Sequence, residues 1–178
     1  MAEPLIEAKE SLLLVVDVQE KLWPHIASKE EVRDQCRMLI EGALLLQVPI
    51  MVSEQYPKGL GATLPELRQA AGEHAQYCEK TSFGCFGDSV ITDRIIRRDL
   101  PWLVLCGIES HVCVLQTALE GLAKGLRVVV VEDAVGSRDE NNHRVAMERI
   151  RDAGGMMVTV EMVLFEWMRT SKHPSFKD

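Results

Sequence analysis

The sequence lacks the features that would assign it to a membrane or to a nucleic acid. No apolar run approaches the roughly 18 residues that a membrane-spanning helix needs. Positive charge is scarce, because 20 lysines and arginines stand against 27 aspartates and glutamates and leave a net charge of −7. We therefore expect neither nucleic acid nor a membrane surface as a partner.

Disulfide and metal patterns are also missing. The number of cysteines is odd, no two of them show CxxC spacing, and the histidines form no HExxH motif. The segment 1–10 carries three glutamates and has the pattern of neither a signal peptide nor a transit peptide. We expect a reducing, cytoplasmic compartment, no bound metal and no cofactor. The cysteines are Cys36, Cys78, Cys85, Cys106 and Cys113.

A glycine-rich phosphate loop is absent as well. The stretch after the first apolar run reads Asp17-Val18-Gln19-Glu20 and has no glycine that would let the backbone approach a pyrophosphate. The pairs Gly59/Gly61 and Gly84/Gly87 do not complete that fingerprint. Dinucleotide binding of the Rossmann type is therefore excluded.

What is present is a regular alternation of short apolar runs and segments with helical spacing. Ser11–Val16 is too short for a helix and is typical of a strand buried on both faces, and 30–47 follows with helical spacing. The alternation predicts a parallel sheet covered by helices on both faces, a three-layer α/β/α fold in one domain over residues 1–178. The further predicted strands are 49–53, 102–106, 127–131 and 156–160, and the further helices are 88–98, 112–124, 141–153 and 161–168.

The segment 54–79 breaks this rhythm. Turn residues occupy 56–61, and Thr63-Leu64-Pro65-Glu66 predicts a helix start with an N-cap and proline in the first turn. Loops after strand ends often carry function in α/β folds. The segment is either a wall or lid of a site or an ordinary surface loop.

Cys113 is the most informative reactive residue. It lies in the first turn of the predicted helix 112–124, which follows the predicted strand 102–106 through a short turn. Unpaired N–H groups at a helix start carry partial positive charge and favour a thiolate, which suits a nucleophile. The alternative is an inert packing residue, because free cysteine is among the most buried residue types.

Two charged residues are expected at the same edge of the sheet as Cys113. Asp17 directly follows the first strand, and Lys80 follows the short stretch 75–79. Ligands of open parallel sheets bind at the carboxyl ends of the strands, so an acid, a base and a thiol gathered there predict a nucleophilic site. Taken singly, Asp17 is equally typical of a turn or helix cap. Lys80 taken singly is most often a solvated lysine.

Three blocks of the sequence resemble the signature blocks of the isochorismatase-like cysteine hydrolases. The similarity runs from about residue 12 to 167, and 53–61 resembles the subgroup of uncharacterised isochorismatase-domain proteins rather than the nicotinamidases. The blocks are Val15-Val16-Asp17-Val18-Gln19, Glu79-Lys80-Thr81-Ser82-Phe83 and Gly107-Ile108-Glu109-Ser110-His111-Val112-Cys113-Val114, with Glu132-Asp133-Ala134 as a further match.

The resemblance implies a Rossmann-like six-stranded parallel sheet and an Asp–Lys–Cys triad. In that triad Asp17 is the general base, Lys80 supports the charges and Cys113 is the nucleophile. A cis peptide between Ile108 and Glu109 and an oxyanion hole from the N–H groups of Glu109 and Cys113 are implied as well. The implied activity is hydrolysis of a small-molecule amide or related non-peptide C–N bond by a homo-oligomer, a dimer or larger.

Two activities of the family fit this sequence poorly. Nicotinamidases hold a metal with an aspartate and histidines after the second strand, whereas this chain has no histidine between His25 and His74. Members that cleave isochorismate often lack the cysteine, which is present here. The competing function is a protein on the same fold without turnover, which binds a metabolite or senses redox state through Cys113.

The walls of the site are less well defined by sequence. The aromatic candidates are individually more typical of core packing than of a pocket. Cys85 is either a second thiol near the site or, as its residue type favours, simply buried. The candidate lining residues are Gln19, Trp23, Tyr56, Phe83 and Phe86.

Overall fold

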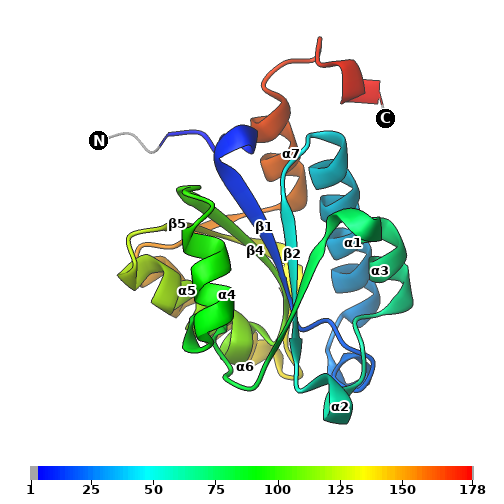
Figure 1. The fold of residues 1–178 in the computed structure, drawn as a ribbon, viewed down its shortest axis with the longest axis vertical. Coiled ribbons are helices and arrows are strands. Elements are labelled where there is room, and N and C mark those ends of the chain that lie inside the picture. Colours follow the sequence, from blue (N-terminus) through cyan, green and yellow to red (C-terminus); the bar gives the residue numbers. More distant parts are fainter. Residues whose placement is uncertain (1–3, 178) are drawn as a thin grey trace.

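Six parallel strands form one sheet, in a computed structural model that describes residues 4–177. Residues 1–3 and 178, the outermost parts of the terminal segments, lie outside the described residues. The strands are β1 (Ser11–Val16), β2 (Ile50–Gln55), β3 (Gln76–Lys80), β4 (Trp102–Ile108), β5 (Arg127–Gly136) and β6 (Met156–Val158). Their order is β3-β2-β1-β4-β5-β6 (Figure 1), which confirms the predicted parallel sheet.

Helices cover both faces of the sheet, as predicted for a three-layer fold. They are α1 (Lys29–Leu45), α2 (Pro57–Leu60), α3 (Pro65–Ala71), α4 (Ser89–Ile96), α5 (Leu115–Ala123), α6 (Glu140–Asp152) and α7 (Val160–Met168). α1, α3 and α7 lie on one face, and α4, α5 and α6 lie on the other (Figure 1). Successive side chains of a strand point to opposite faces. In β1, Leu13 and Val15 therefore pack on the α1 side, and Leu12 and Leu14 on the α5 side.

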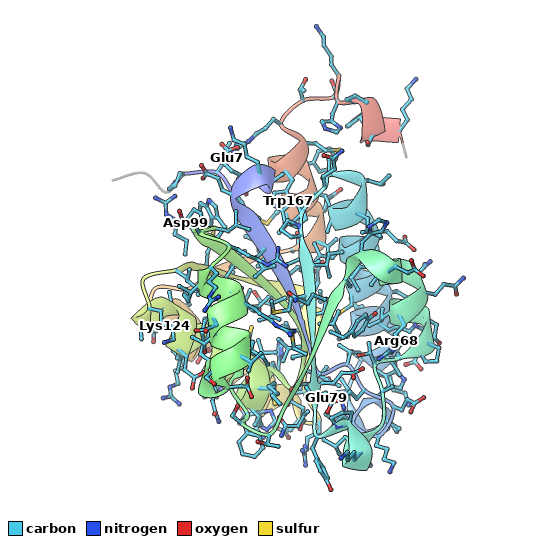
Figure 2. All side chains as sticks on the ribbon, in the orientation of Figure 1. Glu7, Arg68, Glu79, Asp99, Lys124 and Trp167 are labelled. Carbon is cyan, nitrogen blue, oxygen red and sulfur yellow. The ribbon has the colours of Figure 1, made fainter. Side chains whose placement is uncertain are left out.

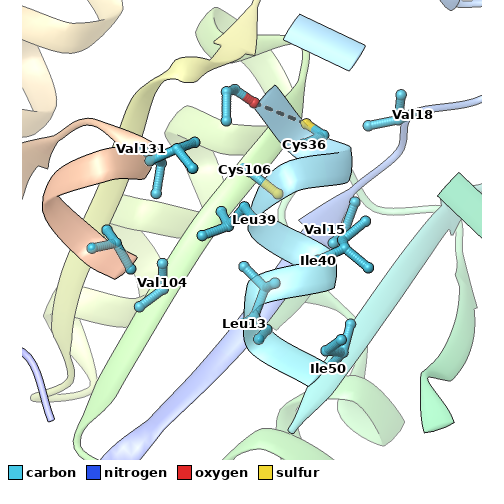
Figure 3. Close-up of a cluster of buried hydrophobic side chains, with 14 of the residues drawn as sticks. Leu13, Val15, Val18, Cys36, Leu39, Ile40, Ile50, Val104, Cys106 and Val131 are labelled. Atoms are coloured by element: carbon cyan, nitrogen blue, oxygen red, sulfur yellow. Dashed lines mark hydrogen bonds between the residues drawn. The ribbon is translucent and has the colours of Figure 1, made fainter. Parts of the chain in front are cut away.

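The core on the α1 side holds two of the cysteines (Figure 3). Cys36 of α1 donates a hydrogen bond from its thiol to the Ala134 carbonyl at 3.2 Å, and Cys106 of β4 lies close by. The neighbouring Cys36 thiol and burial raise the pKa of Cys106 well above its ordinary value. Both side chains are fully buried, so these thiols are packing residues.

The carboxyl ends of the strands lie together at one end of the molecule. Glu79, near the end of β3, lies at this edge, whereas Glu7 and Trp167 lie toward the opposite end (Figure 2). The strand order reverses between β1 and β4, and both strands lead to this edge. Open parallel sheets bind ligands at such a switch point.

The elements next to this edge differ in extent from their prediction. β4 and β5 extend beyond the predicted ends, to Ile108 and Gly136. The predicted helix 112–124 begins later, at Leu115, because one turn of π-helix (Ser110–Val114) precedes α5. Such π-helical turns occur frequently at functional sites.

The segment 54–79 contains the two short helices α2 and α3, of which α3 packs against α1. Pro65 lies in the first turn of α3 as predicted, but Thr63 does not cap it. Leu64 holds the N-cap position, and the Thr63 hydroxyl donates to the buried Glu54 carboxylate at 2.7 Å. Most of this segment is therefore folded onto the α1 side of the molecule. Within residues 4–177, no helix is both long enough and apolar enough to cross a bilayer.

Gly107 lets β4 pass close to β1 beside the switch point. Its φ is +115°, a conformation that side chains rarely adopt, and a Cβ built on it would lie 2.1 Å from the Val16 carbonyl oxygen. Any larger residue here would push apart the two central strands.

We expect Gly107→Ala to lower the free energy of unfolding by at least about 4 kcal/mol, because backbone strain and a clash with Val16 combine. Gly125→Ala is the matched control. Gly125 also has a positive φ, +83°, but nothing lies within 4 Å of its Cβ position. Gly125→Ala should lower the free energy of unfolding only by the roughly 1–2 kcal/mol that the left-handed conformation costs a residue with a side chain. Equilibrium urea unfolding measures the free energy of unfolding of both variants. Equal decreases in the two would contradict the proposed clash with Val16.

Candidate active site

Asp17 is placed by the end of β1. Its φ of +50° starts a sharp turn in a region that aspartate tolerates better than most residues. Its N–H donates to the Ser53 carbonyl at 3.1 Å, and the Ser53 hydroxyl donates to its Oδ1 at 2.7 Å. The carboxylate is fully buried, so its remaining oxygen requires a positive partner.

Lys80, the last residue of β3, supplies that partner by reaching across β2. Its Nζ lies 2.6 Å from Asp17 Oδ2 and 2.8 Å from both Gln55 Oε1 and the Phe83 carbonyl oxygen, with the Ser82 carbonyl at 3.2 Å. Burial alone would lower the pKa of Lys80, but the adjacent Asp17 carboxylate outweighs it and the pKa is raised. Lys80 is therefore a protonated ammonium surrounded by acceptors rather than a solvated side chain.

Cys113 lies in the π-helical turn, next to this ion pair. Burial and the Asp17 carboxylate raise the pKa of its thiol well above the ordinary value, and Lys80 only partly offsets them. Both effects oppose the helix-start effect that favours a thiolate. The turn is not the start of a regular helix, and a neighbouring anion disfavours a second one. The resting residue is a thiol beside a carboxylate that can take its proton.

A second thiol, Cys85, also faces the group. It is fully buried, and burial together with Asp17 raises the pKa of Cys85 to about 11. Its backbone N–H donates to Thr117 Oγ1 at 3.0 Å, and that hydroxyl donates to the Cys113 carbonyl at 2.7 Å. Cys85 is thus both buried and close to the site, and Thr117 joins its loop to the turn that carries Cys113.

Gln19 and Gln55 brace the ion pair. Gln19 Nε2 donates to the carbonyls of Gln55 and Gly61 at 2.9 and 2.7 Å, and its Oε1 accepts from the Gln55 N–H at 2.7 Å. The Gln55 amide in turn donates to the Thr81 carbonyl at 2.8 Å. Gln19 is fully buried, so it supports the loops around Lys80 rather than presenting an open wall.

The four aromatic candidates are not gathered around one pocket. Trp23 packs against the core on the α1 side, and Phe86 packs against the core on the α5 side. Tyr56 and Phe83 are each 55% exposed, on the loops that follow β2 and β3. A cavity of about 310 Å³ borders Lys80 and is lined by Tyr56, Pro57, Lys58, Glu79, Lys80, Thr81 and Asp88.

A smaller cavity of about 170 Å³ lies between the end of β5 and the starts of α1 and α6. Ser137 and His143 line it, together with the carboxylates of Glu31, Glu132 and Glu140. Neither this cavity nor the one at Lys80 is lined by Cys113, whose side chain is almost fully buried. In the described part of the chain, no cluster of three or more histidine, cysteine, aspartate or glutamate side chains is arranged to hold a metal.

The peptide between Ile108 and Glu109 is cis, at the start of the turn that leads to Cys113. The Glu109 carboxylate is buried and accepts hydrogen bonds from both the backbone and the guanidinium of Arg138. Burial alone would raise the pKa of Glu109, but Arg138 outweighs it and the pKa is lowered. Glu109 is therefore an ionised side chain that points to the end of β5.

Several residues around the triad were not predicted as site residues. They come from neighbouring strands and helices, and only a position near a strand end marks any of them in the sequence. They are Ser53, Gln55, Thr117 and Arg138.

Comparisons with known proteins find relatives along nearly the whole chain. The model of a family described as Isochorismatase domain matches residues 11–162. Isochorismatase domain-containing protein 2 of Danio rerio is 37% identical and aligns with 97% of this chain and 86% of its own length. Isochorismatase family protein 1A of Dictyostelium discoideum is also 37% identical, over 94% of this chain and 83% of its own length.

Solved structures show the same fold. One described as MAR1 ribonuclease from Caenorhabditis elegans is 37% identical, with a TM-score of 0.91, and covers 98% of this chain and 89% of its own. The YcaC gene product of Escherichia coli, described as an octameric hydrolase of unknown specificity, is 22% identical. Its TM-score is 0.92, over 97% of this chain and 86% of its own.

We expect Asp17→Asn to speed alkylation of Cys113 by iodoacetamide near neutral pH by about tenfold or more, the equivalent of one pKa unit. The substitution removes the negative charge beside the thiol, so the pKa of Cys113 falls. In the unsubstituted protein, alkylation should rise only at alkaline pH. Mass spectrometry of each cysteine across a pH series measures the rates.

Ser53→Ala is the control for this prediction. It removes the hydroxyl that donates to Asp17 but leaves the carboxylate charge in place. Its effect on the pH profile of Cys113 should be much smaller than that of Asp17→Asn. Slower alkylation in Asp17→Asn than in the unsubstituted protein would show that Asp17 assists deprotonation of the thiol more than its charge opposes the thiolate.

Proposed function

This chain belongs to the isochorismatase family, and from that membership we propose that it hydrolyses a small-molecule amide or related C–N bond with Cys113 as nucleophile. The observation that carries the proposal is the placement of one thiol, one carboxylate and one ammonium at the switch point of the sheet. These groups are buried together, which gives them the low-polarity surroundings in which electrostatic catalysis is most effective. Family membership supports a hydrolase activity. That the bond it cleaves is a C–N bond is our proposal.

In the acylation step, the Cys113 sulfur forms a bond to the carbonyl carbon as Asp17 takes the thiol proton. The carbonyl π electrons move to oxygen, and the tetrahedral intermediate carries the negative charge there. When it collapses, the C–N bond breaks and Asp17 gives the proton to the leaving nitrogen. The products of this step are an amine or ammonia and a thioester on Cys113.

In the deacylation step, water attacks the thioester carbon and Asp17 takes a proton from that water. The C–S bond then breaks, the proton passes to the sulfur, and the carboxylic acid leaves. Lys80 stays protonated throughout and keeps Asp17 oriented, because its Nζ is held by three further acceptors. The net reaction consumes one water for each C–N bond.

The oxyanion of both steps is assigned to the backbone N–H groups of Glu109 and Cys113. Donors that are already in place where negative charge develops are among the largest contributions to catalysis. The cavity beside Lys80 is proposed as the start of the substrate path, with Tyr56 and Phe83 exposed on the neighbouring loops. Because Cys113 lines no part of that cavity, substrate entry requires the loops after β2 or β3 to shift.

RNA is the competing substrate, because the Caenorhabditis elegans relative is described as a ribonuclease. The net charge of −7 is the opposite of what contacts to a phosphate backbone require. We propose that RNA is not the substrate. The non-catalytic alternative, a metabolite-binding or redox-sensing protein, uses the same thiol without turnover.

The test is a panel of small amides and ureides, read by release of ammonia or amine and by the intact mass of the protein. We expect at least one compound to leave a mass adduct on Cys113, and Cys113→Ala to reduce turnover by about 10³-fold or more, since the nucleophile cannot be replaced. Cys78→Ala is the matched control, because Cys78 has the same 6% exposure on β3 and lies outside the triad. Equal loss in both variants would contradict the nucleophile assignment.

Labelled RNA is incubated with the same preparations. RNA cleavage that is present in Cys78→Ala and lost in Cys113→Ala would replace the amide proposal by a ribonuclease. An absence of any adduct or cleavage would leave the metabolite-binding or redox-sensing protein as the function.

We propose that the protein is a cytoplasmic homo-oligomer built from one domain per chain, a dimer or larger. Large apolar side chains that remain exposed on α1 and α7, among them Met38, Leu45, Met162 and Phe165, support this. Light scattering after size-exclusion chromatography should give at least twice the mass of one chain. A monomer at micromolar concentration would contradict the assembly without affecting the proposed chemistry.

A further inference from the structure

Three consecutive residues of the turn before Cys113 are each held by a side chain or backbone group from the segment 137–143. Glu109 binds Arg138, Ser110 binds His143, and His111 binds Ser137. The catalytic assignment above uses none of these side chains. Such a row of contacts fixes both the position and the rotation of the turn.

The contact between Glu109 and Arg138 is the strongest of the three. Arg138 Nε lies 2.9 Å from Glu109 Oε2 and 3.1 Å from Oε1, its terminal NH2 group also donates to Oε1, and its backbone N–H donates to Oε2 at 3.0 Å. A planar guanidinium that grips both carboxylate oxygens allows little rotation of either partner. The Glu109 side chain is therefore locked to the end of β5.

The two histidine contacts flank this ion pair. His111 Nδ1 and the Ser137 hydroxyl are 2.6 Å apart, and His143 Nδ1 and the Ser110 hydroxyl are 3.1 Å apart. His143 comes from α6 and Ser137 follows β5, so two elements hold the turn from the same side. The far end of the turn is held separately, because Thr117 donates to the Cys113 carbonyl.

The sheet brings these partners together. Ile108 at the end of β4 is paired with Gly136 at the end of β5, so Glu109 and Arg138 leave the sheet as near neighbours. This pairing depends on a register shift, in which Leu105 pairs with Val130 but Gly107 pairs with Val135. The extra residues of β5 carry Arg138 far enough along the edge to reach Glu109.

We propose that Arg138 is a positioning residue, which acts through Glu109 to hold the backbone N–H groups of the turn where the oxyanion forms. The inference rests on the proposed function, because it needs a reaction that develops negative charge on a carbonyl oxygen. Arg138 is 61% exposed and contributes little to the packed core, and its hydrogen bonds go to the Glu109 carboxylate of the turn. Its effect is therefore local, on the geometry of residues 109–113.

The experiment compares two reactions of the same thiol. Acylation by p-nitrophenyl acetate passes through a tetrahedral oxyanion, whereas alkylation by iodoacetamide displaces iodide at carbon and forms no oxyanion. We expect Arg138→Ala to slow acylation of Cys113 by about 10- to 100-fold, since a misplacement of about 1 Å costs up to about 100-fold. Alkylation should change by less than about threefold, because thiol ionisation depends on Asp17 and Lys80.

Arg144→Ala is the matched control. Arg144 is 59% exposed and also pairs with a glutamate, Glu148, but on the outer face of α6. Both reactions should be unchanged in this variant. Arg138→Lys restores the charge without the two-pronged grip and should recover only part of the acylation rate. Glu109→Gln should slow acylation as Arg138→Ala does, and combining the two should add little further loss.

The outcomes separate the two hypotheses. A parallel fall of acylation and alkylation in Arg138→Ala would overturn the positioning role, because the substitution would then disturb the thiol itself. Unchanged acylation would overturn it as well, while leaving the proposed hydrolase intact. If the unsubstituted protein is alkylated at Cys113 but never acylated, the proposed function fails, and the positioning role fails with it.

Discussion

The buried ion pair between Lys80 and Asp17 is the interaction on which the site depends. Removing two charges from water is costly, and their attraction offsets that cost only when every remaining lone pair and proton finds a partner. Here the strands supply those partners: Ser53 from β2 donates to Asp17, and Gln55 from β2 accepts from Lys80. The parallel register pairs Val16 with Ser53 and Gln55 with Lys80, so the charges meet because three neighbouring strands end at the same level. A pair of packed apolar residues would be at least as stable there, which makes chemistry the better reason for the pair.

The thiol is brought to this pair by a backbone constraint. Gly107 allows β4 to approach β1 more closely than any side chain would permit, and the chain then turns through 109–113 into α5. Thr117 ties Cys113 to the loop of Cys85, and Arg138 ties Glu109 to the end of β5. The turn is thus held at both ends, whereas Asp17 and Lys80 are held by the sheet itself. The geometry of the site is the sum of these two separate supports.

Local sequence patterns predicted most of the fold. The apolar run of β1, the helical spacing of α1 and the strands that follow are readable because burial on both faces selects continuous apolar residues. The edge at which Asp17 and Cys113 gather follows from the same reasoning, since each comes after a predicted strand, whereas the strand that ends at Lys80 was recognised only as the short stretch 75–79. Ser53, Gln55 and Arg138 could not be found in this way, because their roles arise from register between strands that are distant in sequence. The effect of Asp17 on the thiol could not be predicted either. A motif shows that a helix follows Cys113 but not that a carboxylate lies against its sulfur.

A protonated nucleophile suits this arrangement of charges. At rest, the buried group carries one negative charge on Asp17 and one positive charge on Lys80, and a thiolate would add a second, uncompensated anion. In the proposed reaction, the thiol proton moves to Asp17 as the sulfur attacks, the negative charge moves to the substrate oxygen, and the total charge in the site stays the same. The proposed reaction then requires groups that stabilise a negative charge in a new position, rather than groups that compensate an additional negative charge. We assign the stabilisation of this charge to the backbone N–H groups of Glu109 and Cys113, so the proposed reaction rate depends on how firmly the turn 109–113 is held. In the proposed mechanism, the ion pair of Glu109 with Arg138 supports the oxyanion donors, as the ion pair of Lys80 with Asp17 supports the general base.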